Sequence, residues 1–204
     1  MKPDLWAVIP VKPFALGKSR LAGVLDAPSR TALNRKLFDH VFNTTVAGLG
    51  ANRVAVVTSG AELAATIDAR GAHGIVSEQD LNAALGYACR MAAARGAQAI
   101  VVLPSDLPFV SQDDIAALAA ALPPAPGVVV APDAADQATN ALVLSPPDPD
   151  FFRFGPSSFA AHLEAARERG ATAAIVRRPG LAFDLDTPED YRAFVRRVSE
   201  HAPS

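Results

Sequence analysis

Residues 98–103 read Gln-Ala-Ile-Val-Val-Leu, and the turn-forming segment Pro-Ser-Asp-Leu-Pro follows at 104–108. A short apolar run that ends in such a turn is typical of a strand buried on both faces of a sheet. Helical patterns lie on either side of this run, over residues 82–95 and 112–122. A buried strand between helices of this length indicates a βαβ unit, and therefore a mostly parallel sheet.

The same alternation continues outward from this strand in both directions. Only a loop separates the apolar runs at 127–131 and 140–144, which indicates a small antiparallel addition to the sheet. The sequence therefore predicts one three-layer α/β domain over residues 1–204, with a tail that frays after Glu200. The remaining predicted strands lie at 5–11, 53–58, 73–77, 174–177 and 181–183, and the remaining helices at 28–49, 62–70, 157–169 and 188–198.

The composition excludes several functional classes. The chain has 204 residues and a net charge of −2, without the basic surplus that is typical of nucleic-acid-binding proteins. Its single cysteine, Cys89, cannot form an internal disulfide or a zinc cluster, so we expect it to be buried in a protein of a reducing compartment. No apolar run reaches the roughly 18 residues of a membrane span, and the N-terminal run is too short for a secretory signal. The sequence predicts a soluble, cytoplasmic monomer or homodimer without nucleic-acid or membrane partners.

A basic loop follows the first predicted strand, at the edge of a parallel sheet where ligands bind. It contains Lys12 and, after five residues, Lys18-Ser19-Arg20. Beside Gly17 these cations can cradle a triphosphate, because Arg binds two phosphate oxygens as a fork and Lys acts as a point charge. The alternative is a solvated basic loop. Although Gly17-Lys18-Ser19 is similar to the end of a P-loop, a P-loop requires glycine at the position of Lys12.

Carboxylates follow two other predicted strands. Asp106 comes directly after the strand quoted above, and Asp184 and Asp186 have the spacing that places both on one side of an extended segment. Asp106 with one of the other two can hold Mg²⁺ against a triphosphate. The alternative for Asp106 is to cap the turn before the helix at Ser111, and for Asp186 it is to cap the last helix.

Two predicted helix starts are further candidates for ligand contacts. Ser157 and Ser158 open a helix whose N–H groups and dipole favour an anion, and Gly155 lets such an anion approach the backbone. The alternative is an ordinary serine cap, and we expect His162 in the same helix to be structural. Asn82 opens another helix, where its amide can read a base edge or cap the helix.

Taken together, these motifs resemble the 2-phospho-L-lactate guanylyltransferase family of coenzyme F(420) biosynthesis. The resemblance covers nearly the whole chain, from around Ala7 to Val195, and implies the Rossmann-like fold of the nucleotide-diphospho-sugar transferases. It also implies an enzyme that transfers GMP from GTP to 2-phospho-L-lactate, phosphoenolpyruvate or 3-phospho-D-glycerate. The motifs that carry it are IPVK at 9–12, KSRL at 18–21, LPSDLP at 103–108, TNAL at 139–142, FGPSSF at 154–159 and FDLDTPED at 183–190.

The resemblance also implies roles for single residues. One departure concerns the acceptor pocket, because relatives often carry glycines before TNAL where this chain has Gln137-Ala138. The implied roles are phosphate binding and catalysis for Lys18 and Arg20, a place beside the guanine for Asn82, Mg²⁺ ligation for Asp106 and Asp186, and contact with the acceptor acid for Thr139, Gly155 and Ser158.

In such a reaction the phosphate oxygen of the acceptor attacks the α-phosphorus of GTP, so no protein base or covalent intermediate is needed. Repulsion between the two polyanions is the main obstacle, which Lys12, Lys18, Arg20 and Mg²⁺ would neutralise. The expected product is an unstable GDP-linked phospho-acid that is handed to the next enzyme.

Two alternatives stay open from the sequence. One is an enzyme of the same fold that acts on a sugar phosphate or molybdopterin. Such enzymes usually carry a glycine-rich LAGGxGxR loop, where this chain reads Ile-Pro-Val-Lys-Pro at 9–13. The other is a non-catalytic nucleotide-binding module, which would be marked by loss of a carboxylate or of the basic loop.

Overall fold

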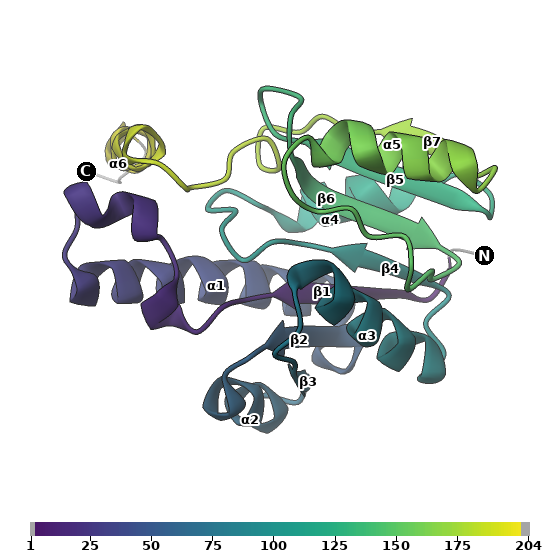
Figure 1. Ribbon diagram of the computed structural model, residues 1–204, viewed down its shortest axis with the longest axis horizontal. Coiled ribbons are helices and arrows are strands. Elements are labelled where there is room, and N and C mark those ends of the chain that lie inside the picture. The colour runs from purple at the N-terminus through teal and green to yellow at the C-terminus, as the bar shows by residue number, and fades with distance from the viewer. Residues whose placement is uncertain (1–2, 201–204) are drawn as a thin grey trace.

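The computed structural model describes residues 3–200, which form a single α/β domain around a seven-stranded sheet (Figure 1). The strands lie in the order β3-β2-β1-β4-β6-β5-β7. β6 is antiparallel to both of its neighbours, β4 and β5, while the other adjacent pairs in this described sheet are parallel. The predicted fold class is therefore confirmed. The bounds are β1 (Leu5–Pro10), β2 (Val54–Thr58), β3 (His73–Val76), β4 (Ala99–Val102), β5 (Gly127–Pro132), β6 (Thr139–Ser145) and β7 (Thr172–Ile175).

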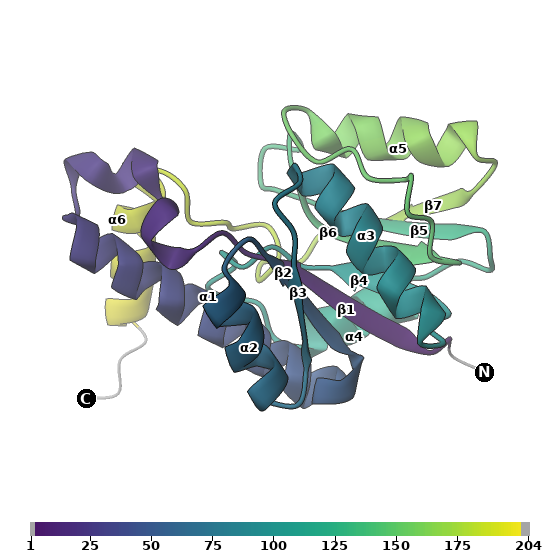
Figure 2. The ribbon, with the colours of Figure 1, turned by 60° about the horizontal axis from the view of Figure 1, so that its bottom comes forward.

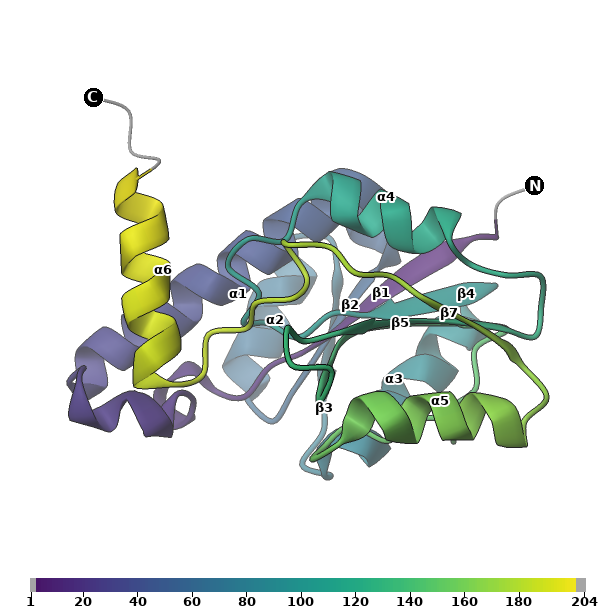
Figure 3. The ribbon, with the colours of Figure 1, turned by 90° about the horizontal axis from the view of Figure 1, so that it is seen from above.

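Helices cover both faces of the sheet and make it the middle of three layers (Figure 3). α1 (Ala27–Leu49), α2 (Ala61–Ala69) and α4 (Gln112–Ala120) pack on one face, and α3 (Leu81–Ala94) and α5 (Ser158–Glu168) on the other. Successive side chains of a strand point to opposite faces. In β4, Ala99 and Val101 therefore join the first core, while Ile100 and Val102 join the second.

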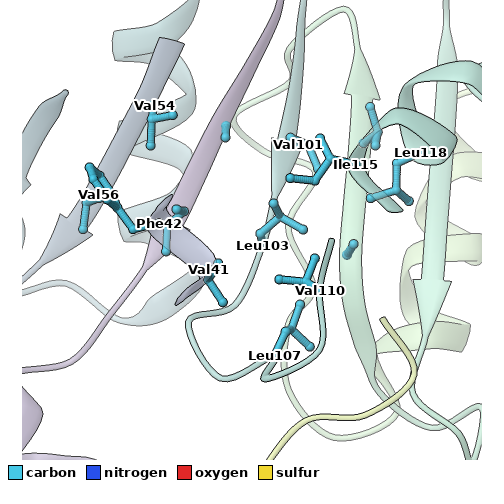
Figure 4. Close-up of a cluster of buried hydrophobic side chains, with 14 of the residues drawn as sticks. Val41, Phe42, Val54, Val56, Val101, Leu103, Leu107, Val110, Ile115 and Leu118 are labelled. Atoms are coloured by element: carbon cyan, nitrogen blue, oxygen red, sulfur yellow. The ribbon is translucent and has the colours of Figure 1, made fainter. Parts of the chain in front are cut away.

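The core beneath α1 and α4 also anchors the loop that follows β4 (Figure 4). Leu103, Leu107 and Val110 continue this core beyond the last residue of the strand, and each is at most 2% exposed. Burial of a large apolar side chain contributes roughly 1.5–3 kcal/mol to stability. The loop that carries Asp106 is therefore held at both of its ends.

α6 (Pro188–Glu200) lies apart from the sheet, beside the start of α1 (Figures 1 and 2). The 3-10 helix η2 (Ser19–Gly23) lies in the same region, after η1 (Phe14–Leu16). A small apolar cluster joins these elements through Leu21 of η2, Leu37 of α1 and Leu185. We call η2, α6 and the part of α1 that they contact the end lobe.

The predicted elements agree with the structure to within two residues at each end, with one exception. The strand predicted at 181–183 is wrong. The backbone N–H groups of Leu181 and Ala182 both donate to the carbonyl oxygen of Arg178, which makes a turn. The side chain of Leu181 is fully buried, so the apolar pattern there reflects burial rather than a strand.

Two other predictions concern the ends and the cysteine. Cys89 is buried as expected, and burial raises the pKa of its thiol to about 12. The expected fraying after Glu200 concerns residues 201–204, which lie outside the described residues. Between residues 3 and 200, no helix has both the length and the apolar character to cross a membrane.

Candidate active site

A pocket of ≈ 880 Å³ opens at the carboxyl ends of the parallel strands. It is lined by segments that follow β1, β2, β3 and β4, within residues 10–20, 57–59, 77–79 and 104–106, and by Asp186. Its volume is in the range of ligand pockets, about 300–1,000 Å³. This is the edge of the sheet at which the sequence predicts a site.

Lys18 joins the two predicted metal carboxylates. Its Nζ donates one hydrogen bond to Asp106 Oδ2 and another to Asp186 Oδ1, each over 2.8 Å. The Lys18 side chain is only 6% exposed. Burial alone would lower the pKa of its ammonium, but the charges of the two carboxylates and their hydrogen bonds outweigh burial and raise this pKa. Lys18 therefore carries a positive charge between two acidic groups.

Backbone contacts hold the two carboxylate segments side by side. The N–H of Leu185 donates to the carbonyl oxygen of Asp106 over 3.1 Å. Leu185 is buried in the cluster of the end lobe, and Leu107 is buried in the main core. Each carboxylate therefore neighbours an anchored leucine, which restricts its movement.

Among the hydrogen bonds of residues 3–200, neither of these carboxylates caps a helix. Ser111 caps α4, where its side chain accepts from the N–H of Asp114. At the start of α6, Asp190 Oδ2 accepts from the N–H groups of Asp186 and Thr187. The capping alternatives are therefore wrong, and the carboxylates of Asp106 and Asp186 are directed to Lys18.

Asp184 has a different environment from Asp186. Its Oδ1 accepts a hydrogen bond from Asn140 Nδ2 over 3.2 Å, and it is not among the residues that line the pocket. Burial and the charge of Asp106 raise the pKa of the Asp184 carboxyl, against the opposing effect of the Asn140 hydrogen bond. Of the two candidates for the second metal ligand, this geometry favours Asp186.

Asp106 and Asp186 fit a magnesium ion by the chemistry of their donors. Mg²⁺ prefers oxygen ligands, and it usually binds through one or two carboxylates together with water and substrate phosphates. The part of the chain that the structure describes holds no group of three or more His, Cys, Asp or Glu residues arranged to hold a metal. Substrate oxygens and water would therefore complete the coordination.

The other two basic residues of the loop are exposed in the same pocket. The Arg20 side chain is 73% exposed, and its guanidinium nitrogen lies 3.8 Å from Asp186 Oδ2, in a surface pair that contributes little to stability. Lys12 also lines the pocket and makes no hydrogen bond or ion pair with residues 3–200. A solvated basic loop would explain the exposure of these two residues but not the burial of Lys18.

Asn82 lies beside the pocket but does not line it. Asp80, rather than Asn82, caps α3, so the capping alternative is wrong. The side-chain amide of Asn82 makes two hydrogen bonds with the backbone of Phe154. Its Nδ2 donates to the carbonyl oxygen over 3.0 Å, and its Oδ1 accepts from the N–H over 2.8 Å. Asn82 therefore holds Phe154, which does line the pocket, and a contact with the guanine stays a prediction.

Thr139 and Ser158 are buried next to each other. The N–H of Thr139 donates to Ser158 Oγ over 2.9 Å, and Thr139 Oγ1 lies 2.9 Å from His162 Nδ1. Because His162 Nε2 accepts from the N–H of Arg153, its proton is on Nδ1 and is donated to Thr139. Burial, with the nearby charge of Arg153, lowers the pKa of His162 to about 4. The prediction that His162 is structural is therefore confirmed.

Gly155 is exposed beside this group, with a φ of 144° that few residues other than glycine adopt. Ser157 is the N-cap residue of α5 but makes no side-chain capping bond, so the serine-cap alternative is wrong. Thr139, Gly155 and Ser158 do not line the pocket that contains Lys18. Their contact with an acceptor stays a prediction.

Some pocket residues were missed in the sequence. Thr58 is the last residue of β2 and Ser59 follows it directly, so the rule that ligands bind at strand ends would have found them. Asn34 lies within the first half of α1 and has no such signal. Its Nδ2 donates to the carbonyl oxygen of Phe14 over 2.7 Å, a contact that only the packing of α1 against the basic loop creates.

Comparisons with known proteins agree with this architecture. A protein-family model described as "Guanylyl transferase CofC like" matches residues 5–199. The chain is 42% identical to phosphoenolpyruvate guanylyltransferase of Rubrobacter xylanophilus, over 92% of this chain and 91% of that protein. It is 38% identical to phosphoenolpyruvate guanylyltransferase of Sphaerobacter thermophilus, over 97% of this chain and 93% of that protein.

Solved structures share the fold at lower sequence identity. A crystal structure from Desulfovibrio desulfuricans G20, assigned to the nucleotide-diphospho-sugar transferases, matches with a TM-score of 0.73 and 16% identity, over 98% of this chain and 90% of that chain. The CTP complex of CMP:2-keto-3-deoxy-manno-octonic acid synthetase matches with a TM-score of 0.62 and 15% identity, over 97% of this chain and 99% of that chain.

Proposed function

Since the chain belongs to the CofC-like guanylyl transferase family, we propose that it transfers GMP from GTP to the phosphate of phosphoenolpyruvate and releases pyrophosphate. The choice of acceptor is supported by the names of the two relatives described above. 2-Phospho-L-lactate and 3-phospho-D-glycerate are alternatives of the same chemical class. The product would be a GDP-linked phospho-acid of coenzyme F(420) biosynthesis. A cytoplasmic location and transfer of this product to a following enzyme stay predictions.

One observation in the structure supports this chemistry most directly. Lys18 Nζ lies 2.8 Å from a carboxylate oxygen of both Asp106 and Asp186, at the carboxyl end of the sheet. These three residues come from distant parts of the sequence. Their meeting in one pocket is what a triphosphate site with a divalent cation requires.

The reaction asks little of the protein beyond charge and position. The phosphate of the acceptor is already an anionic nucleophile, so it needs no base to remove a proton. The described pocket accordingly needs no serine, cysteine or histidine nucleophile. Its work is to bring two polyanions together and to keep the attacking oxygen in line with the leaving pyrophosphate.

The basic loop supplies the charge for this task. Lys12 and Arg20 are exposed in the pocket, where they can bind phosphate oxygens without breaking any buried contact. Asp106 and Asp186 would hold Mg²⁺, which when bound neutralises triphosphate oxygens and the charge that develops on the leaving pyrophosphate. Lys18, which lies beside these carboxylates, would stabilise negative charge on the triphosphate.

The two alternatives from the sequence make different predictions. A sugar phosphate or molybdopterin acceptor would give pyrophosphate release with those compounds and none with phospho-acids. A non-catalytic module would bind GTP and release no pyrophosphate with any acceptor. The experiment is therefore to incubate the protein with GTP, Mg²⁺ and each acceptor separately, and to measure pyrophosphate. We expect the largest release with phosphoenolpyruvate.

The variant Asp106→Asn tests the site within this reaction. We expect it to lower pyrophosphate release by roughly a thousandfold, as for the loss of a key electrostatic group, while GTP still binds. Asp113→Asn is the matched control, because Asp113 is exposed in the first turn of α4, outside the pocket. Pyrophosphate release by Asp106→Asn within a few-fold of the control would contradict the proposed role of Asp106.

A further inference from the structure

Resting on the function proposed above, we propose that Lys18 competes with the divalent cation for Asp106 and Asp186. Asp106 and Asp186 would then be free to hold the metal only when the triphosphate draws the ammonium away. Metal binding and nucleotide binding are coupled through this one side chain. The enzyme would therefore bind Mg²⁺ weakly by itself and tightly together with GTP.

The first support is the geometry of the three side chains. The Lys18 ammonium donates to Asp106 Oδ2 and to Asp186 Oδ1 at the same length, 2.8 Å, so it bridges the two carboxylates. A divalent cation that bridged the same two carboxylates would stand within a few ångströms of this ammonium. Two cations at such a separation repel each other strongly in a partly buried site. The ammonium and the metal therefore exclude each other from the bridging position.

The second support is the difference between Lys18 and the other cations of the loop. The side chain of Lys18 is 6% exposed, whereas that of Arg20 is 73% exposed and only reaches Asp186 over 3.8 Å. Lys12 has no ion-pair partner among residues 3–200. Phosphate binding alone would be served by exposed cations. A buried lysine on both carboxylates needs a further role.

The third support is that the ammonium can move while its backbone stays in place. Lys18 has a left-handed backbone conformation, with a φ of 56°, and its carbonyl oxygen accepts from the N–H of Leu21 in η2. The end lobe therefore fixes its Cα, while its four-carbon side chain stays rotatable. The pocket that Lys18 lines lies directly beside it, so triphosphate oxygens there can attract the ammonium.

The test measures metal binding without turnover. Mn²⁺ is titrated into the protein without nucleotide and is followed by the electron paramagnetic resonance signal of free Mn²⁺. We expect weak binding to the wild type and at least roughly tenfold tighter binding to Lys18→Met, which loses the competing charge. GTP without acceptor should tighten Mn²⁺ binding to the wild type much more than to this variant.

Three further variants separate the proposal from simpler effects. Lys12→Met removes one positive charge from the same pocket without a contact to either carboxylate, so it should bind Mn²⁺ nearly as weakly as the wild type. Lys18→Arg keeps the charge and should also bind weakly. If Lys18→Met does not fold, as judged by thermal unfolding, Lys18→Gln replaces it. In a folded variant, Mn²⁺ should raise the melting temperature more than in the wild type.

Two outcomes would overturn the proposal. One is an equal Mn²⁺ affinity of the wild type and Lys18→Met. The other is an increase in Mn²⁺ affinity in Lys12→Met as large as that in Lys18→Met. Neither outcome depends on catalysis. If the enzyme releases pyrophosphate but Lys18→Met binds Mn²⁺ no more tightly than the wild type, only the proposed competition between Lys18 and the metal is contradicted. Failure of every acceptor to release pyrophosphate would defeat the proposed function, while the Mn²⁺ titration without nucleotide would still decide the competition.

Discussion

Gly17 gives the basic loop the space that it needs beside α1. A Cβ atom built at Gly17 would lie 2.5 Å from Asn34 Nδ2, which is closer than real contacts allow. Asn34 cannot yield easily, because the same nitrogen donates to the carbonyl oxygen of Phe14. We therefore expect Gly17→Ala to shift the loop next to Lys18 and to weaken GTP binding by roughly tenfold, a loss of about 1.4 kcal/mol. Isothermal titration calorimetry measures this change.

Gly23 provides the control for this substitution. It is the last residue of η2, and a Cβ atom there would meet nothing within 4 Å. Gly23→Ala should therefore bind GTP as the wild type does. If Gly17→Ala and Gly23→Ala bound GTP with equal affinity, the contact between Gly17 and Asn34 would not position the basic loop.

The sequence predicts site residues well where one rule of the fold places them. Lys18 and Asp106 follow strands of a parallel sheet, so their convergence follows from the topology. Asn82 and Ser158 were harder to interpret, because their partners are distant. Asn82 bonds the backbone of Phe154, and no local pattern encodes a contact across 72 positions of the chain.

At the scale of elements, the end lobe fixes one half of the carboxylate pair. Leu185 is fully buried between Leu21 and Leu37, and its backbone N–H reaches the carbonyl oxygen of Asp106. Leu185→Ala should lower the free energy of unfolding by about 2–5 kcal/mol, as usual for a buried leucine. It should also reduce pyrophosphate release, because Asp186 loses its anchor. Urea denaturation and the pyrophosphate assay measure the two effects.

Val198→Ala is the control within the same lobe. Val198 lies in α6 but is 48% exposed, so its truncation should change stability by no more than about 0.5 kcal/mol. Activity should stay at the wild-type level. If Leu185→Ala kept full activity despite its lower stability, the end lobe would not position Asp186.

Most elements of the fold were predictable because their apolar patterns have a single explanation. Alternating strands and helices with short loops leave few topologies other than a mostly parallel sheet. The segment at 181–183 shows the limit of this reasoning. Leu181 is buried in a turn that Asn140 holds through the carbonyl oxygen of Leu181, while Ala182 and Phe183 are only partly buried. A short apolar run of this kind cannot be told from a strand by its pattern.

At the scale of the whole molecule, His162 connects three parts of the fold. It belongs to α5, donates to Thr139 at the start of β6, and accepts from the backbone of Arg153. The next residue, Phe154, is held by Asn82 of α3. Neutral His162 therefore stabilises the packing of α5 against the sheet and against the loop that precedes α5. The same loop is bonded to α3 through Asn82.

This connection predicts how stability depends on pH. The pKa of His162 is lowered from 6.5 to about 4 in the folded protein, so its neutral form is favoured by folding. The resulting stability is fully present above about pH 6.5, and it is lost as pH falls from there to about 4. The difference between these two pKa values corresponds to a contribution on the order of 3 kcal/mol to the free energy of unfolding. Urea denaturation between pH 4.5 and 8 should show the fall, after comparison with a variant that lacks the histidine.

His162→Gln is this variant, and it should be less stable at pH 8 but should lose less stability as the pH falls. His40→Gln is the control, because His40 bonds the carbonyl oxygen of Val110 on the opposite face of the sheet and leaves the His162 contacts intact. Groups that titrate in all three proteins cancel when their pH profiles are subtracted. An equal loss in His162→Gln and the wild type would mean that His162 does not set the acid sensitivity of the fold.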